Sequence, residues 1–220
     1  MTRVLSLLAI AGLVGGCASH ASVTTAHTVG EGNFQGAIEP GVGSVSTDVA
    51  PTFNAAFRYG VSEKVDIGAR FGSTVYELTG KYMFTDTEGT VVSIAPAATL
   101  FAIGGGGGGA GFFTASTPVL IGIPVGESQF IVGPNWVIYS AIGGGAGVSS
   151  GGLTMGPGAH LAYSAKMGEK FRLHPELSLK LPGVINFASA GAGGSSVSAG
   201  STSTGVPIVG FTLGMLFGGD

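Results

Sequence analysis

Apolar and polar residues alternate with a period of two along most of this chain, and helical spacing is absent. The clearest example is FRLHPELSLKL, residues 171–181, in which every odd-numbered residue is apolar and every even-numbered residue is polar. Successive side chains of a strand point to opposite faces, so this pattern predicts a strand with one apolar face. Similar or weaker alternation predicts ten strands, at residues 34–42, 51–60, 65–72, 76–84, 90–102, 115–125, 130–139, 153–163, 171–181 and 206–217.

The predicted fold is all-β, an antiparallel up-and-down transmembrane β-barrel of about ten strands, with about eight to twelve as the range. Strands of about ten residues can cross a bilayer, and a closed barrel pairs every backbone group. A soluble sandwich would show the same alternation, but only 10% of residues are charged and the aromatic residues fall mostly on the apolar faces. The last strand ends in Phe217, which resembles the assembly signal of outer-membrane barrels.

The lengths of the connections also favour an outer-membrane barrel, in which periplasmic turns are short and outer loops are long. The even-numbered connections are short and charged, as at Ser62-Glu63-Lys64. Connections one and three, which would be outer loops, are also short and do not fit this pattern. Connections five, seven and nine are long, at residues 103–113, 141–152 and 182–205, and the fifth contains six consecutive glycines. Glycine-rich transmembrane helices are an alternative that the prolines and β-branched residues disfavour.

The N-terminal residues have the features of a bacterial export signal. Arg3 precedes an apolar run that is too short to cross a bilayer, which is typical of a secretory signal peptide. Cys17, the single cysteine, follows LVGG, and this arrangement resembles the lipobox of bacterial lipoproteins. The resemblance implies a lipid anchor on Cys17. We therefore expect a signal peptide at 1–16, a tether at 17–32 and the barrel at 33–217.

Charged residues on the polar faces of the predicted strands would point into the barrel. Their signs nearly balance, and a barrel of about ten strands is narrow, so we expect a neutralised, plugged lumen. The alternative is a narrow polar pore for ions or small solutes. The predicted lumen charges are Glu39, Arg58, Asp66, Arg70, Glu77, Lys81, Arg172, Glu176 and Lys180, with His160 and His174 nearby.

No motif in the chain predicts catalysis or a cofactor. The six glycines match a dinucleotide-binding pattern only as any homopolymer does, since neither a helix nor a suitably spaced acid follows. The four histidines lack metal-ligand spacing, and a net charge of −3 gives no reason to expect nucleic acid. We expect that the protein is not an enzyme and binds no metal or cofactor. An enzyme that acts on lipid is a further alternative, for which the sequence shows no set of catalytic residues.

The lipobox, together with hairpins such as GVSEKVDIGARFG, resembles small lipid-anchored outer-membrane barrel proteins of Gram-negative bacteria. One such group, known from predatory bacteria, forms homo-oligomeric rings that enclose lipid. Residues 89–126, 128–165 and 181–219 contain no Asp, Glu, Lys or Arg, and uncharged loops fit that group. The resemblance implies an outer-membrane location with a periplasmic lipid anchor, membrane lipids as partners and a homo-oligomer. The hypothesis is a structural or lipid-organising barrel, and the alternative is a small porin-like channel.

Overall fold

The computed structural model describes residues 23–45, 48–72, 75–86, 89–105, 108–144, 151–181, 183, 185–189, 197–200 and 207–219. The predicted signal peptide, Cys17 and residues 18–22 lie outside this part of the chain. Within the described residues all regular secondary structure is strand. No helix among them is long and apolar enough to cross a membrane.

Fourteen strand segments make up the fold. They are β1 (Phe34–Val45), β2 (Asp48–Ser62), β3 (Val65–Gly72), β4 (Val75–Asp86), β5 (Val91–Ile94), β6 (Ala97–Gly105), β7 (Gly108–Ser116), β8 (Val119–Val125), β9 (Ser128–Gly144), β10 (Gly151–Gly168), β11 (Phe171–Lys180), β12 (Ile185–Ser189), β13 (Val197–Gly200) and β14 (Ile208–Gly218).

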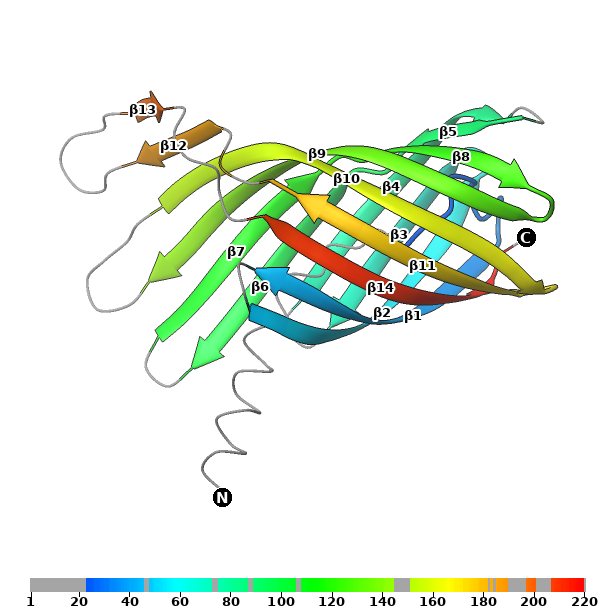
Figure 1. Ribbon diagram of the computed structural model, residues 1–220, viewed down its shortest axis with the longest axis horizontal. Helices are drawn as coiled ribbons and strands as arrows, with labels where there is room; N and C mark the ends of the chain where they lie inside the picture. The colour runs from blue at the N-terminus through cyan, green and yellow to red at the C-terminus, as the bar shows by residue number, and fades with distance from the viewer. Residues whose placement is uncertain are drawn as a thin grey trace, which may run out of the picture.

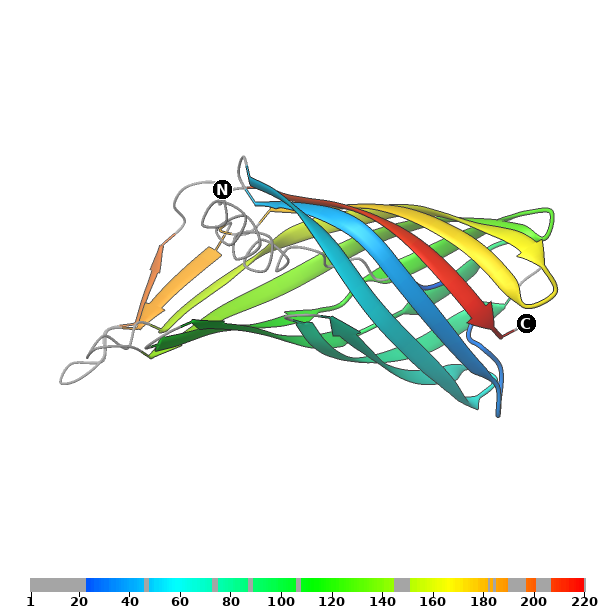
Figure 2. The same cartoon turned by 90° about the horizontal axis from the view of Figure 1, so that it is seen from below.

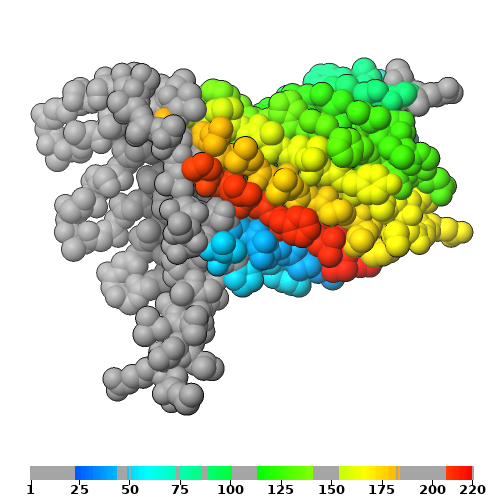
Figure 3. Space-filling model, viewed as in Figure 1, coloured from blue at the N-terminus to red at the C-terminus, as the bar shows by residue number. Residues whose placement is uncertain are grey.

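These segments form one closed antiparallel barrel (Figures 1 and 2). β1 pairs with β2 on one side and with β14 on the other, which closes the sheet. Figure 3 shows β14 on the surface between β1 and β11. Both β5 and β6 pair with β4, both β7 and β8 pair with β9, and both β11 and β12 pair with β10. β13 and β14 likewise belong to one strand of the wall, because β13 pairs with β12 and β14 pairs with β11. Each of these four pairs of segments forms a single strand, so the fourteen segments make ten strands and the predicted barrel of ten strands is confirmed.

Two of the ten strands are interrupted at prolines. Pro96 separates β5 from β6, and Pro118 separates β7 from β8. A proline has no N–H to donate to the ladder, which explains the interruptions. The carbonyls of both prolines still accept bonds, from the Gly80 N–H and the Ala95 N–H at 2.9 Å each, so the wall remains connected.

The long outer connections differ from the prediction, because much of each one is strand. β6 and β7 remain paired into the six glycines, as far as Gly105 and Gly108, and only residues 106–107 separate them. β9 likewise extends to Gly144, while β12 and β13 occupy part of the ninth connection. The hydrogen bonds between strands join backbone atoms and do not depend on the side chains. A run of glycines can therefore form a strand although its sequence shows no alternation of apolar and polar residues.

One end of the barrel carries two-residue turns at residues 63–64, 126–127 and 169–170, together with the start of β1 and the end of β14. We call this the short-turn end. The short connection predicted at Ser62-Glu63-Lys64 is confirmed, and the even-numbered connections at 126–127 and 169–170 are equally short. In Figure 1 the C-terminus marks this end of the barrel.

The two faces of the wall follow the predicted alternation. On the outer face large apolar side chains are exposed, as for Phe53 at 62% and Leu78 at 69%. Their sequence neighbours Asn54 and Glu77 are buried on the inner face. The barrel is therefore apolar outside and largely polar inside, the reverse of a soluble globular domain.

Candidate functional site: the interior of the barrel

Residues 23–30, which we call the N-terminal plug, lie inside the barrel near the short-turn end. The chain reverses into the lumen before β1 begins, through Gly30 and Gly32, whose φ angles of 77° and 74° favour glycine. Val23 and Ala26 are fully buried, and Val29 is 2% exposed. The predicted tether at 17–32 therefore differs from the structure, which places its described residues 23–30 in contact with the lumen wall.

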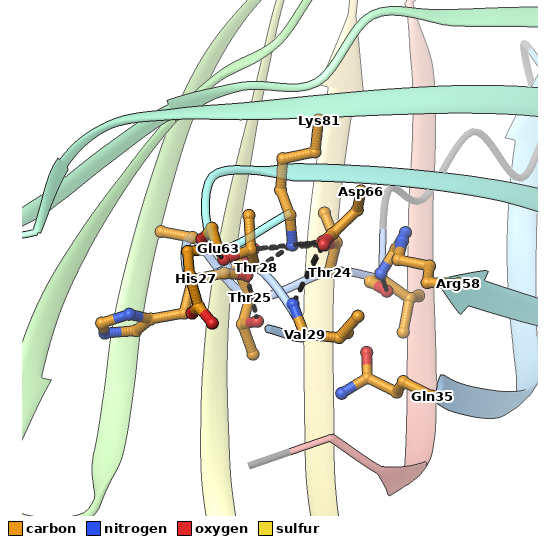
Figure 4. A network of polar contacts seen from close by, with 12 residues as sticks. Thr24, Thr25, His27, Thr28, Val29, Gln35, Arg58, Glu63, Asp66 and Lys81 are labelled. Carbon is orange, nitrogen blue, oxygen red and sulfur yellow. Dashed lines mark hydrogen bonds and ion pairs between the residues drawn. The ribbon is translucent and has the colours of Figure 1, made fainter. Parts of the chain in front are cut away.

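Side chains of β2, β3 and β4 hold the backbone of the N-terminal plug (Figure 4). Arg58 donates from Nη1 to the Val23 carbonyl at 2.9 Å. The Val29 N–H donates to the Asp66 carboxylate at 3.1 Å. Extended backbone inside a barrel has polar groups without a ladder partner, and these charged side chains pair with two of them.

Lys81 is the side chain with the most contacts to the N-terminal plug. Its Nζ donates to Thr24 Oγ1 at 3.2 Å, to the Thr25 carbonyl at 3.3 Å and to the His27 carbonyl. The same ammonium pairs with Asp66 Oδ2 at 2.8 Å. Because Asp66 also accepts from the Val29 N–H, the pair joins the wall to both ends of the stretch 24–29.

Other contacts of the N-terminal plug are mostly apolar. Ala26 packs into a buried cluster with Met83, Val91, Ala95, Leu120, Ile131 and Ala162. Its N–H donates to Gln129 Oε1 at 3.0 Å. Val23 packs with Ala37 and Leu216. The interior therefore contains a small hydrophobic core to which the plug contributes Ala26 and Val23.

Glycines on the inner face of the wall make room for the plug. A Cβ on Gly214 would stand 2.2 Å from Val23 Cγ1, and one on Gly122 would stand 2.7 Å from the Cβ of Ala26. Carbon atoms normally approach to about 3.5–4.0 Å. Any side chain at these two positions would therefore displace the plug or deform the wall.

A second polar network fills the lumen beyond the plug. Arg70 pairs with Glu77 at 2.6 Å and with Glu39 at 3.5 Å, and Thr99 donates to Glu77 at 2.8 Å. Arg70 and Glu77 are direct cross-strand partners of β3 and β4. All these side chains are buried, so each charge depends on its partners for stabilisation.

Eight of the nine predicted lumen charges are buried: Glu39, Arg58, Asp66, Arg70, Glu77, Lys81, Glu176 and Lys180. The structure brings the first six into the two networks above. Glu176 lies 3.6 Å from His174, and both are buried. Arg172 lies on the same face of β11 at the short-turn end, where it lines the mouth of the lumen, is partly exposed and donates to the Glu127 carbonyl at 3.1 Å.

The cavities show how little of the described interior is open. A cavity of about 420 Å³ lies at the short-turn end, where its lining includes the exposed Glu63 and Glu127 and the buried Thr25 and Val29 of the plug. Deeper cavities measure only about 20 Å³ and 10 Å³. Each has room for about one water molecule. Among the described residues no group of three or more His, Cys, Asp or Glu could hold a metal ion.

Sequence reasoning missed the plug and the residues that hold it, such as Gln129, Gly122 and Gly214. The segment ASVTTAHTVG has small, β-branched and polar residues, a composition equally suited to an exposed tether. A signal was present in Gly30 and Gly32, which flank the reversal of the chain. It could not be distinguished from an ordinary loop without knowing where β1 begins.

Comparison with known proteins finds no matching family model and no matching curated protein. Among solved structures, Neisserial surface protein A is 12% identical, with 84% of this chain and 95% of that chain covered and a TM-score of 0.45. The outer membrane protease OmpT from Escherichia coli is 7% identical over 90% and 100%, with a TM-score of 0.46. OprG from Pseudomonas aeruginosa is 10% identical over 89% and 99%, with a TM-score of 0.40. Similarities this low assign neither a family nor an activity.

Proposed function

We propose that this protein is a non-enzymatic β-barrel of a bacterial outer membrane, with a closed lumen and a structural or lipid-organising role. The observation that carries the closed lumen is the N-terminal plug, which is buried and bonded to the wall through Arg58, Asp66, Lys81 and Gln129. A barrel of this kind would act through its outer surface and its ends, because the plug would obstruct an aqueous path through the lumen.

The outer surface supports insertion in a membrane. Exposed apolar side chains surround the barrel, and such a surface would be unstable in water. Aromatic side chains also gather near the short-turn end. The rings of Phe171 and Phe217 pack at a tilt with centroids 5.2 Å apart, and those of Tyr82 and Phe84 pack edge to face with centroids 5.0 Å apart. Aromatic girdles at the lipid–water boundary are typical of outer-membrane barrels.

The proposed lipid anchor on Cys17 is compatible with the plug. Val23 packs beside Ala37, which is three residues from the start of β1 and therefore about 10 Å from the short-turn end. The six residues from Val23 back to Cys17 can span about 20 Å. A chain of this length that runs back beside the plug would bring a lipid on Cys17 to the membrane surface at this end, the proposed periplasmic side. The mass of the mature protein tests this, since Cys17→Ser should remove the mass of the lipid.

Single-channel recording in planar bilayers tests the closed lumen. We expect no steady openings from the wild-type protein, with incorporation into vesicles verified by flotation. Steady openings that disappear when Arg58 and Arg70 are both replaced by glutamine would contradict the proposal. That result would establish the alternative, a porin-like channel lined by these charges.

The lipid-organising role is tested separately, by the mass and lipid content of the native particle. A homo-oligomeric ring around lipid should appear as a multiple of the chain mass together with bound phospholipid. A lipid-free monomer, extracted under mild conditions, would rule out the ring while leaving the closed lumen unaffected.

A further inference from the structure

The inner end of the N-terminal plug borders a small space between the plug and the wall. This cavity of about 20 Å³ is lined by Thr24 of the plug and by side chains from several strands, among them Lys81 on β4 and Lys180 on β11. β4 and β11 are five positions apart in the ring of ten, so they face each other across the lumen. The cavity therefore occupies the middle of the barrel, not a recess in one wall.

Positive charge predominates around this cavity. Four cationic side chains line it, but only one carboxylate does, that of Glu77. The cations are Arg58, Arg70, Lys81 and Lys180. Glu39 and Asp66, which pair with Arg70 and Lys81, do not line the cavity. The cations thus surround the space from facing strands, while two of their counter-charges lie outside its lining, and this arrangement favours an anion.

His160 provides an independent indication of a ligand at the same place. It lines the cavity, is only 6% exposed, and its Nε2 has no hydrogen-bond partner among the residues that the structure describes. The ring lies against Gly133, where a Cβ would stand 1.8 Å from Nε2. A buried polar atom without a partner is uncommon, and a bound water or ion is the usual explanation.

We infer that this cavity binds one small monovalent anion, of halide size, between the plug and the barrel wall. The space admits about one water-sized particle, which excludes phosphate groups and organic acids. Arg58 and Lys81 hold the plug and also line the cavity, so an anion there would stabilise the plugged state. This site is independent of the proposed membrane function, since it requires only the folded barrel with its plug in place.

Thermal unfolding at constant ionic strength tests the inference. The full mature protein is melted in detergent in 150 mM sodium chloride, bromide or gluconate, the last being too large for the cavity. We expect a Tm about 3–5 °C higher in either halide, the shift produced by a tenfold excess over the dissociation constant. Lys180→Met should reduce the difference to below about 1 °C. Lys166→Met, which removes a rim ammonium paired with Glu127 at 3.0 Å, should retain it.

Equal Tm values in halide and gluconate would overturn the inference, as would an unchanged difference in Lys180→Met. Crystals of the wild-type protein grown in bromide give a second test that needs no variant. An anomalous peak beside Lys180 and His160 is expected. A water molecule there, without anomalous signal, would equally overturn the inference. Neither result bears on conductance, so failure of the anion site and failure of the closed lumen remain distinguishable.

Discussion

Replacing Gly214 by alanine should loosen the N-terminal plug without removing any of its hydrogen bonds. The new Cβ would stand 2.2 Å from Val23 Cγ1, and the wall cannot yield because the carbonyl oxygen and Cβ of His174 lie 3.3 Å and 3.4 Å from the same point. To restore ordinary contact, Val23 must retreat by about 1.3 Å. Val23 is fully buried against Ala37 and Leu216, so this displacement disrupts a packed contact.

Overpacking of this kind costs about 1–3 kcal/mol. If the cost falls on the plugged state, the population with a released plug rises about 5- to 150-fold, since 1.4 kcal/mol corresponds to a factor of about ten. Limited proteolysis measures this population, because cleavage within residues 23–30 requires release of the plug when opening and closing are fast. Proteinase K digestion of the vesicle-inserted protein, followed by mass spectrometry, should show cleavage faster by the same factor.

Gly36→Ala is the matched control, since Gly36 is a strand glycine of the adjacent β1 with no atom within 4 Å of its Cβ position. Its cleavage rate should stay within about twofold of wild type. An unchanged rate in Gly214→Ala, with the barrel folded by circular dichroism, would refute the packing argument. An equal acceleration in both variants would refute it too, because the effect would then reflect loss of glycine and not contact with Val23.

Three further substitutions test other parts of the structure. Lys81→Met leaves buried Asp66 without its ion partner and should lower stability by about 3–5 kcal/mol in urea unfolding, whereas changing both residues to apolar ones should recover much of the loss. Glu77→Gln should likewise lower the free energy of unfolding, by roughly 3 kcal/mol or more. Lys166→Met, at the partly exposed rim, should lower it by less than about 1 kcal/mol. Equal losses in the two variants would disprove the buried network. Leu78→Arg, on the outer face, should weaken folding into vesicles by about 2–4 kcal/mol relative to Leu78→Ala, and no difference would contradict burial of this face in lipid.

Much of the lumen network could be predicted from the sequence once the strands were assigned. Asp66 and Lys81, and likewise Arg70 and Glu77, lie symmetrically about the short connection between β3 and β4, so a hairpin places each pair side by side. Contacts across the lumen could not be predicted, because they depend on the number of strands and the stagger of the barrel. The pairing of Arg70 with Glu39, two strands away, is such a contact.

The sequence by itself determined the barrel, because alternation by two is a local property that each strand carries independently of the others. It determined equally which charges face inward and where the short turns fall. Only the tertiary structure decided that residues 23–30 lie inside the barrel and that Gly104, Gly105, Gly108 and Gly109 are paired strand residues. Both depend on groups that become neighbours only when the barrel closes. The plug is held through backbone atoms common to every residue, and glycine leaves no side-chain pattern from which its pairing could be predicted.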